Sequence, residues 1–220
     1  MIGSLPAPYL RIPKAGDGLS VGLFGGSFNP PHDGHLHVSE LVLARARLDR
    51  IWWIVTPGNP LKEHGNLAPL AERVAACRRI ARHPRIDITA FEARFDTRYT
   101  ADTLAILKRL RPRLRFVWIM GADNLGNFHH WQNWRAIADT LPMVVVDRPG
   151  ATFTLTSAPA AIALSRFRID EGDAALLPSM KPPVWTFVHG PRSALSSTRI
   201  RASKGNRGTG PASSGALGQG

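Results

Sequence analysis

Short apolar runs alternate with amphipathic segments along most of the chain. The apolar runs end at turn-forming residues and are short enough to be buried strands, whereas apolar residues that recur every three or four positions indicate helices. The predicted strands are residues 19–24, 51–56, 86–89, 115–120, 143–146 and 184–188. The predicted helices are residues 34–47, 70–82, 131–138 and 196–202, with one more that begins near Thr100.

The helix near Thr100 shows the pattern most fully. Thr100 or Asp102 is expected to cap its first turn, because Thr and Asp side chains accept hydrogen bonds from the unpaired amides there. Leu104, Leu107 and Leu110 follow at helical spacing. We expect these three leucines to lie along one side of the helix.

Strands that alternate with helices predict βαβ units. The fold class is therefore α/β, with a Rossmann-like, doubly wound, mainly parallel sheet and helices on both faces. In such sheets ligands bind beyond the carboxyl ends of the strands, where the strand order reverses. Gly25 and Gly121 each follow a predicted strand, so we expect the site there. We expect an N-terminal extension over residues 1–19, the domain over 20–204 and a disordered Gly/Ser/Ala-rich tail over 205–220.

Composition and charge limit the function classes. The chain has 220 residues, and 28 basic against 16 acidic side chains give a formal net charge of +12. The excess favours anionic partners, but charge alone does not separate a phosphorylated substrate from nucleic acid or from a merely basic surface. No apolar run of about 18 residues predicts a membrane helix, and residues 1–20 lack the pattern of a secretory signal. The single cysteine, Cys77, cannot form an internal disulfide, and a cytoplasmic location is the simplest expectation.

The segment GGSFNPPHDGH, residues 25–35, carries the first candidate chemistry. Gly25 and Gly26 allow the backbone to approach a phosphate without a Cβ in the way. The helix that follows presents unpaired amides to an anion. His32 and His35 at its start can donate hydrogen bonds to phosphate oxygens as charge develops.

Two other interpretations of this segment remain open. A proline-rich turn with solvent-exposed histidines has the same composition. A zinc site would use His32, His35 and His37, but His35 and His37 are two residues apart on a helix and point to different sides. Because no cysteine cluster supplements them, we predict no protein-held metal. The spacing matches neither the Walker A loop nor the GxGxxG dinucleotide fingerprint.

The segment resembles the signature of the HxGH nucleotidyltransferase superfamily, whose members transfer a nucleoside monophosphate from a triphosphate. The second phosphate element of that superfamily is a late Ser/Thr-rich helix start that ends in arginine, and SSTRIR at 196–201 is similar to it. An ordinary capped helix is the alternative. The resemblance implies that Arg201 acts with His32 and His35 in catalysis. The ATP-binding residues it implies are Gly25, Gly26, Ser27, Phe28, His32, His35, Ser196, Ser197, Thr198 and Arg201.

Four further segments resemble the nicotinate-nucleotide adenylyltransferase branch of that superfamily. They are RYTADTL at 98–104, GADN at 121–124 with Phe128, Trp131 and Trp134, VDRPG at 146–150, and PGNPLK at 57–62. The resemblance spans roughly residues 21–202. One departure is Asn29, where many relatives carry aspartate; asparagine can still accept local hydrogen bonds.

The resemblance implies which aromatic residue binds the nicotinate ring. This ring is flat and electron-poor, so an indole can stack on it. Trp131 is the residue at the matching position, and Trp134 would then pack inside. A core role for Trp131 is the alternative.

The polar candidates for the nicotinate nucleotide follow from the same resemblance. Backbone amides near Tyr99 and Thr100, at a helix start, would bind the ring carboxylate. Asp123 would hold ribose hydroxyls or orient the nucleotide. Lys62 and Arg148 would contact phosphate or pyrophosphate, or are surface charges.

The resemblance implies in-line attack by the 5′-phosphate of nicotinate mononucleotide on the α-phosphorus of ATP, with Mg²⁺ held mainly by phosphates. The expected partners are these two nucleotides, with no nucleic acid and no membrane, and the oligomeric state is open, a homo-oligomer included. Rival interpretations are a sister enzyme that acts on nicotinamide mononucleotide or phosphopantetheine, a basic nucleic-acid-binding protein, and an ATP-binding regulator without turnover.

Overall fold

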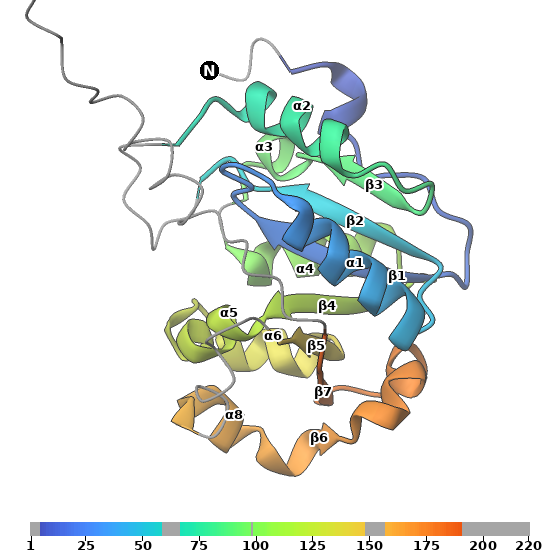
Figure 1. The fold of residues 1–220 in the computed structure, drawn as a ribbon, viewed down its shortest axis with the longest axis vertical. Helices are drawn as coiled ribbons and strands as arrows, with labels where there is room; N and C mark the ends of the chain where they lie inside the picture. Colours follow the sequence, from blue (N-terminus) through green and yellow to red (C-terminus); the bar gives the residue numbers. More distant parts are fainter. Residues whose placement is uncertain (1–4, 59–66, 98, 148–156, 191–220) are drawn as a thin grey trace, which may run out of the picture.

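The computed structural model describes residues 5–58, 67–97, 99–147 and 157–190, and within them the strands form one parallel sheet. The order across the sheet is β3-β2-β1-β4-β5-β7-β6, and every pair is parallel. The predicted Rossmann-like parallel sheet is therefore confirmed (Figure 1). The strands are β1 (Ser20–Gly26), β2 (Arg50–Val55), β3 (Ile86–Thr89), β4 (Arg115–Gly121), β5 (Met143–Val146), β6 (Arg168–Ile169) and β7 (Trp185–Val188).

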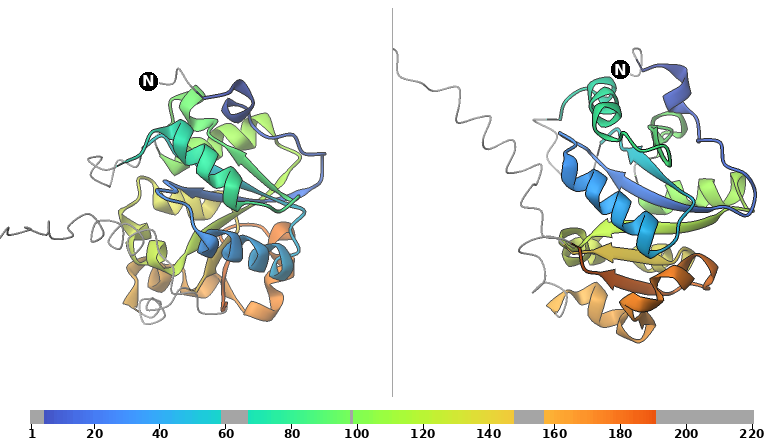
Figure 2. Two further views of the ribbon diagram at one scale, coloured as in Figure 1. Left: turned by 45° about the horizontal axis from the view of Figure 1, so that its top comes forward. Right: turned by 45° about the vertical axis from the view of Figure 1, so that its right-hand side comes forward.

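Helices cover both faces of the sheet (Figures 1 and 2). One face packs against α1 (Asp33–Arg45), α2 (Leu70–Ile80) and the 3-10 helix η4 (Glu171–Ser179). The other face packs against α4 (Thr100–Leu110), α5 (Ala122–Asn127), α6 (Trp134–Thr140) and α8 (Pro159–Ala163). Shorter elements are α3 (Glu92–Phe95) and the 3-10 helices η1 (Ala7–Leu10), η2 (Phe128–His130) and η3 (Ser165–Phe167). None of the described helices is long and apolar enough to cross a membrane.

The continuous apolar runs become central strands because both of their faces are buried. In β2, Trp52 packs into the core on the α4 side, whereas Trp53 packs into the core on the α1 side. Residues of β4 alternate in the same way, with Trp118 on the α4 side and Ile119 on the α1 side. Successive side chains of a strand point to opposite faces, so one run of sequence supplies both cores.

The structure corrects two predictions about helices, the cap of α4 and the start of α6. The N-cap of α4 is Tyr99, which is extended and makes no side-chain cap hydrogen bond, so neither Thr100 nor Asp102 is the cap. Of the three leucines expected along one side of α4, Leu104 and Leu107 are buried and Leu110 is 43% exposed. The helix expected over residues 131–138 begins only at Trp134, after a left-handed residue at Asn133 with φ of 54°.

Residues before β1 pack against the edge of the sheet at β3. The backbone amide of Ala90 donates to the carbonyl of Tyr9 (2.7 Å), and the Thr89 hydroxyl donates to the carbonyl of Arg11 (2.9 Å). The Arg78 guanidinium of α2 lies 5.5 Å from the centre of the Tyr9 ring. These contacts cover a sheet edge that would otherwise expose unpaired backbone groups.

The strand order reverses between β1 and β4. From β1 the chain moves outward to β2 and β3, and from β4 it moves in the other direction to β5 and β7. The two strands pair directly, with Phe24 opposite Ile119. Ligands of doubly wound sheets bind beyond the carboxyl ends of the strands at such a reversal. Gly25 and Gly121 both lie at these ends, which makes this edge the candidate site.

Candidate active site

Packing leaves no room for a side chain at Gly25, one of the two glycines that end β1. A Cβ built on Gly25 would lie 2.8 Å from Cη2 of Trp118 on the neighbouring strand β4, a distance that real side chains essentially never adopt. A Cβ on Gly26 would lie 3.4 Å from the Phe28 ring. The indole of Trp118 therefore fills the space that a side chain at Gly25 would occupy. Gly25 is one of the two glycines at which the sequence predicts close approach of a phosphate.

Phe28 anchors the loop between β1 and α1. Its backbone has a positive φ of 45°, which is uncommon for a non-glycine residue. Its ring stacks on Trp53 with centroids 5.0 Å apart and lies 4.9 Å from the His35 ring. Only 2% of Phe28 is exposed. A contact between Phe28 and ATP would therefore come from its backbone, because the ring is enclosed in the core.

His32 and His35 lie together at the start of α1. Both are buried, and their ring centroids are 3.9 Å apart. The backbone amide of His32 donates to Nδ1 of His35 (3.2 Å), and the amide of His35 donates to the carbonyl of His32 (2.8 Å). Because Nδ1 accepts, a neutral His35 carries its proton on Nε2, which leaves that nitrogen as a donor.

A buried hydrogen-bond chain fixes the turn of α1 that carries His35. The Ser39 hydroxyl donates to the carbonyl of His35 (2.9 Å), and Nε1 of Trp53 donates to that hydroxyl oxygen (2.8 Å). Ser39 and Trp53 are completely buried. The backbone of His35 is thus linked to β2 through Ser39 and Trp53, two side chains that lie outside the sequence motif.

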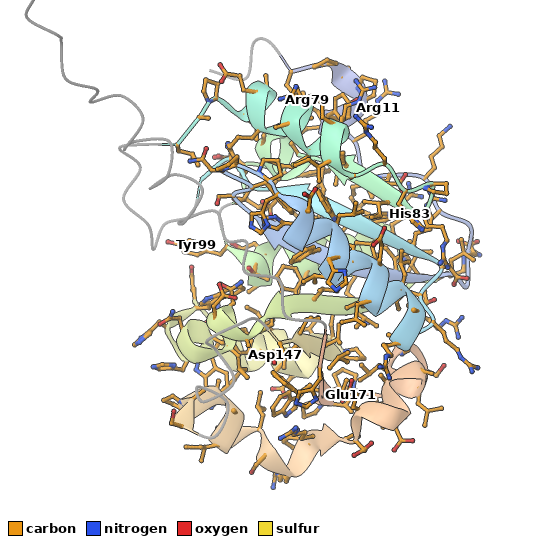
Figure 3. The ribbon with its side chains drawn as sticks, viewed as in Figure 1. Arg11, Arg79, His83, Tyr99, Asp147 and Glu171 are labelled. Atoms are coloured by element: carbon orange, nitrogen blue, oxygen red, sulfur yellow. The ribbon has the colours of Figure 1, made fainter. Side chains whose placement is uncertain are left out.

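The start of α4 lies on the other face of the sheet, where Tyr99 is 39% exposed (labelled in Figure 3). In the first turn of α4, the Thr103 hydroxyl donates to Oε1 of the buried Glu92 (2.7 Å). Burial raises the pKa of Glu92 to about 7, and hydrogen bonds from Thr103 and Thr56 act in the opposite direction. Sequence reasoning missed Glu92, because Thr56 lies far from it along the chain and Thr103 lies in the next helix.

Aromatic side chains gather beyond the end of β4. Trp131 makes T-shaped contacts with Trp118 and Phe128, at centroid distances of 6.3 and 5.4 Å. Trp134 also makes a T-shaped contact with Phe128 (5.7 Å), and the Arg135 guanidinium lies 4.4 Å from the centre of its ring. Both tryptophans are partly buried against the same core. Asp123, in the first turn of α5, is exposed.

The structure brings the first motif and the nicotinate candidates to one edge from opposite faces of the sheet. His32 and His35 come from the α1 face, and Tyr99, Thr100 and Trp131 come from the α4 face. Figure 3 shows Tyr99 on the side where the strands end and His83, which precedes β3, on the opposite side. The candidates Lys62, Arg148, Ser196, Ser197, Thr198 and Arg201 lie outside the described residues.

Comparisons with known proteins decide the family. The Cytidylyltransferase-like family model matches residues 23–203. A Mesorhizobium japonicum protein that bears the name probable nicotinate-nucleotide adenylyltransferase is 59% identical over 190 residues, which cover 86% of this chain and 97% of the relative. A Rhizobium meliloti protein of the same name is 57% identical over 186 residues, covering 84% of this chain and 99% of the relative.

The chain belongs to the nicotinate-nucleotide adenylyltransferase family. Solved structures support the fold of this family member. The Plasmodium falciparum nicotinic acid mononucleotide adenylyltransferase complexed with NaAD superposes with a TM-score of 0.63 at 18% identity, covering 84% of this chain and 83% of that chain. The same enzyme complexed with APC gives a TM-score of 0.61 with the same coverage. The predicted family and fold are thus confirmed.

Proposed function

We propose that the protein transfers the adenylyl group of ATP to nicotinate mononucleotide, giving nicotinate adenine dinucleotide and pyrophosphate in NAD biosynthesis. The relatives that carry this activity in their names match the chain over nearly their whole length. The observation that carries the proposal for the site is the buried His32–His35 pair beside the glycines of β1, at the reversal of strand order.

In the proposed reaction an oxygen of the acceptor's 5′-phosphate attacks the α-phosphorus of ATP. The new P–O bond forms as the bond from the α-phosphorus to the bridging oxygen breaks, and pyrophosphate leaves with that oxygen. Because the attacking phosphate is ionised at neutral pH, no general base is needed. Positioning and charge stabilisation then supply the rate enhancement.

The residues of the β1–α1 loop would bind the triphosphate. His35 would donate from Nε2 to a phosphate oxygen, since its Nδ1 is occupied as an acceptor. His32 would donate to the same group, because its ring lies 3.9 Å from that of His35. Ser196, Ser197, Thr198 and Arg201 would complete the phosphate site, as the resemblance implies.

The nicotinate nucleotide would bind on the α4 side of the same edge. Trp131 would stack on the ring, since Trp134 already lies against Arg135. Amides near Thr100 would bind the ring carboxylate, with Tyr99 beside them and Asp123 on the ribose. Lys62 and Arg148 would contact its phosphate.

A divalent ion fits this arrangement as part of the ATP complex. In the described part of the chain, no three His, Cys, Asp or Glu side chains are grouped so as to hold an ion. We propose Mg²⁺ bound mainly by ATP phosphates and water, the mode usual for this ion in nucleotide sites. The ion would neutralise charge on the departing pyrophosphate.

The test is pyrophosphate release from ATP and Mg²⁺ by the purified protein with three acceptors side by side. We expect the highest kcat/KM with nicotinate mononucleotide. A higher kcat/KM with nicotinamide mononucleotide or phosphopantetheine would replace the proposed acceptor. A cytoplasmic location and the lack of a nucleic-acid partner remain predictions.

A further inference from the structure

Arg73, in the first turn of α2, is a buried cation in contact with the β1–α1 loop. It is 2% exposed, and no other arginine or lysine among the described residues is buried. Burial lowers the pKa of its guanidinium. In the described part of the chain no carboxylate forms an ion pair with it.

The guanidinium donates to four backbone carbonyls from three separate segments. Nη1 donates to Ser27 (2.7 Å) and Thr56 (2.8 Å). Nη2 donates to Pro57 (3.3 Å), and Nε donates to Ala68 (2.8 Å). One side chain therefore joins the β1–α1 loop, the end of β2 and the segment that leads into α2.

A buried arginine without a carboxylate partner is an unfavourable way to stabilise a fold. Removing an arginine from water carries a large desolvation cost, and a well-packed apolar side chain of similar volume is often as stabilising as a buried ion. Carbonyl dipoles, rather than a carboxylate, satisfy the donors of Arg73. The rigid planar fork of arginine is suited to holding several acceptors in fixed relative positions.

The contact with Ser27 has a direct consequence for the amide of Phe28. In a trans peptide the N–H points opposite to the C=O of the preceding residue. Because the Ser27 carbonyl points to Arg73, the Phe28 N–H points away from Arg73. A second hydrogen bond joins the β1–α1 loop to the segment before α2, since the amide of Ala68 donates to Oδ1 of Asn29 (3.3 Å).

We propose that Arg73 is a positioning residue that turns the Phe28 amide toward the triphosphate and fixes the β1–α1 loop against the end of β2. This inference rests on the proposed function, because it assigns the triphosphate of ATP to that loop. Arg73 acts through Ser27 and Thr56 and does not touch the nucleotide. Loss of the fork lets the Ser27–Phe28 peptide rotate, which weakens ATP binding and misaligns the α-phosphate.

The experiment compares Arg73→Lys and Arg73→Met with the wild-type protein. Lysine keeps the charge but lacks the planar fork, whereas methionine keeps an apolar stem of similar length. We expect both variants to lose about 10- to 100-fold in kcat/KM for ATP, with a smaller change in KM for nicotinate mononucleotide. Calorimetric titration with ATP and Mg²⁺ alone, without acceptor, should show weaker binding in both.

Arg50→Lys is the matched control. Arg50 also makes forked hydrogen bonds, to the carboxylate of Asp87 (2.7 and 2.9 Å), but at the opposite end of β2. We expect this variant to lower the melting temperature without changing KM for ATP. If the Arg50 and Arg73 substitutions both lowered the melting temperature and both raised KM for ATP, Arg73 would act through stability only. That result would overturn the proposal.

Two further outcomes decide the case. Full activity in Arg73→Lys would show that charge suffices, and unchanged ATP affinity in a folded Arg73→Met would show that the fork is dispensable; either overturns the proposal. If neither variant folds, the backbone amide of Phe28 in the ¹⁵N-labelled wild-type protein decides: its resonance should shift on addition of ATP and Mg²⁺, and an unmoved resonance overturns the proposal. A wild-type protein that binds ATP but makes no dinucleotide would instead refute the proposed function.

Discussion

The backbone amide of His32 donates to Nδ1 of His35, at 3.2 Å, so the first histidine of the motif orients the ring of the second. The same contact fixes which nitrogen of a neutral His35 can donate to a ligand. Since Nδ1 is the acceptor, Nε2 carries the proton and is the donor. The spacing of the motif thus sets a tautomer as well as a position.

Two substitutions of His35 separate the roles of its nitrogens. His35→Asn keeps an acceptor near the Nδ1 position, and His35→Gln places an amide near the Nε2 position. We expect kcat to fall by about 10²-fold or more in His35→Asn and by less in His35→Gln. Steady-state kinetics check this, with His83→Asn as a control on the opposite side of the molecule. Equal kcat values for His35→Asn and the wild type would remove His35 from the catalytic residues.

Glu92 predicts a distinctive dependence of stability on pH. Its pKa of about 7 in the folded protein lies above its ordinary value of 4.5, so the folded state favours the neutral carboxyl. Its contribution is present in full below pH 4.5 and is lost as the pH rises through 7, a change of about 3 kcal/mol in the free energy of unfolding. Glu92→Gln removes this term, because the amide stays neutral and still accepts from Thr103. In urea unfolding from pH 5 to 8, the free energy of unfolding of Glu92→Gln should increase relative to that of the wild type as the pH rises. If the two free energies changed with pH in parallel, the assignment would be refuted.

Trp131 and Trp134 are predicted to differ in function. Trp131→Ala should raise KM for nicotinate mononucleotide by about tenfold, because a stacked aromatic pair contributes about 1 kcal/mol beyond the area it buries. KM for ATP should change little. Trp134→Ala should lower the melting temperature and leave the first KM nearly unchanged, since its ring packs against Phe128 and Arg135. If Trp134→Ala raised KM for nicotinate mononucleotide and Trp131→Ala only lowered the melting temperature, Trp134 would be the residue that stacks on the nicotinate ring.

Gly25 and Trp118 are predicted to be energetically coupled. Gly25→Ala places a Cβ 2.8 Å from Cη2 of Trp118 and should destabilise the protein by about 1–3 kcal/mol. Trp118→Phe shortens the ring below that glycine. In the double variant the cost of the added methyl group should fall, giving a coupling energy of about 1 kcal/mol in a double-mutant cycle. Strictly additive losses of stability would show that the close approach is relieved elsewhere.

The central sheet could be predicted from sequence because its signals are local. The run of residues 51–56 is apolar at almost every position, and the observed β2 sends Trp52 and Trp53 into cores on opposite faces. The nine-residue 3-10 helix η4, by contrast, contains Pro178 and no clear apolar period, so no pattern predicted it. The early start assigned to α6 failed because the left-handed residue Asn133 breaks the helix, and asparagine does not by itself require that conformation.

The site could be predicted only where the motif itself contributes the chemistry. His32 is the N-cap of α1 and His35 is the third residue of the helix, so their proximity follows from the geometry of a capped helix start. Arg73 and Glu92 were not predicted. Arg73 binds backbone carbonyls up to 46 positions away. Every residue has a backbone carbonyl, so the sequence does not indicate which ones accept these hydrogen bonds. Glu92 pairs with Thr103 across the turn between α3 and α4, where sequence gives only an acidic residue after an apolar one.

The most direct measurement of adenylyl transfer follows two labels. ATP labelled at the α-phosphorus or at the γ-phosphorus is incubated with the protein, Mg²⁺ and nicotinate mononucleotide, and the products are separated by chromatography. The account predicts that the α-label enters the dinucleotide and the γ-label enters pyrophosphate. An α-label found only in ADP or AMP, with no dinucleotide formed, would contradict it.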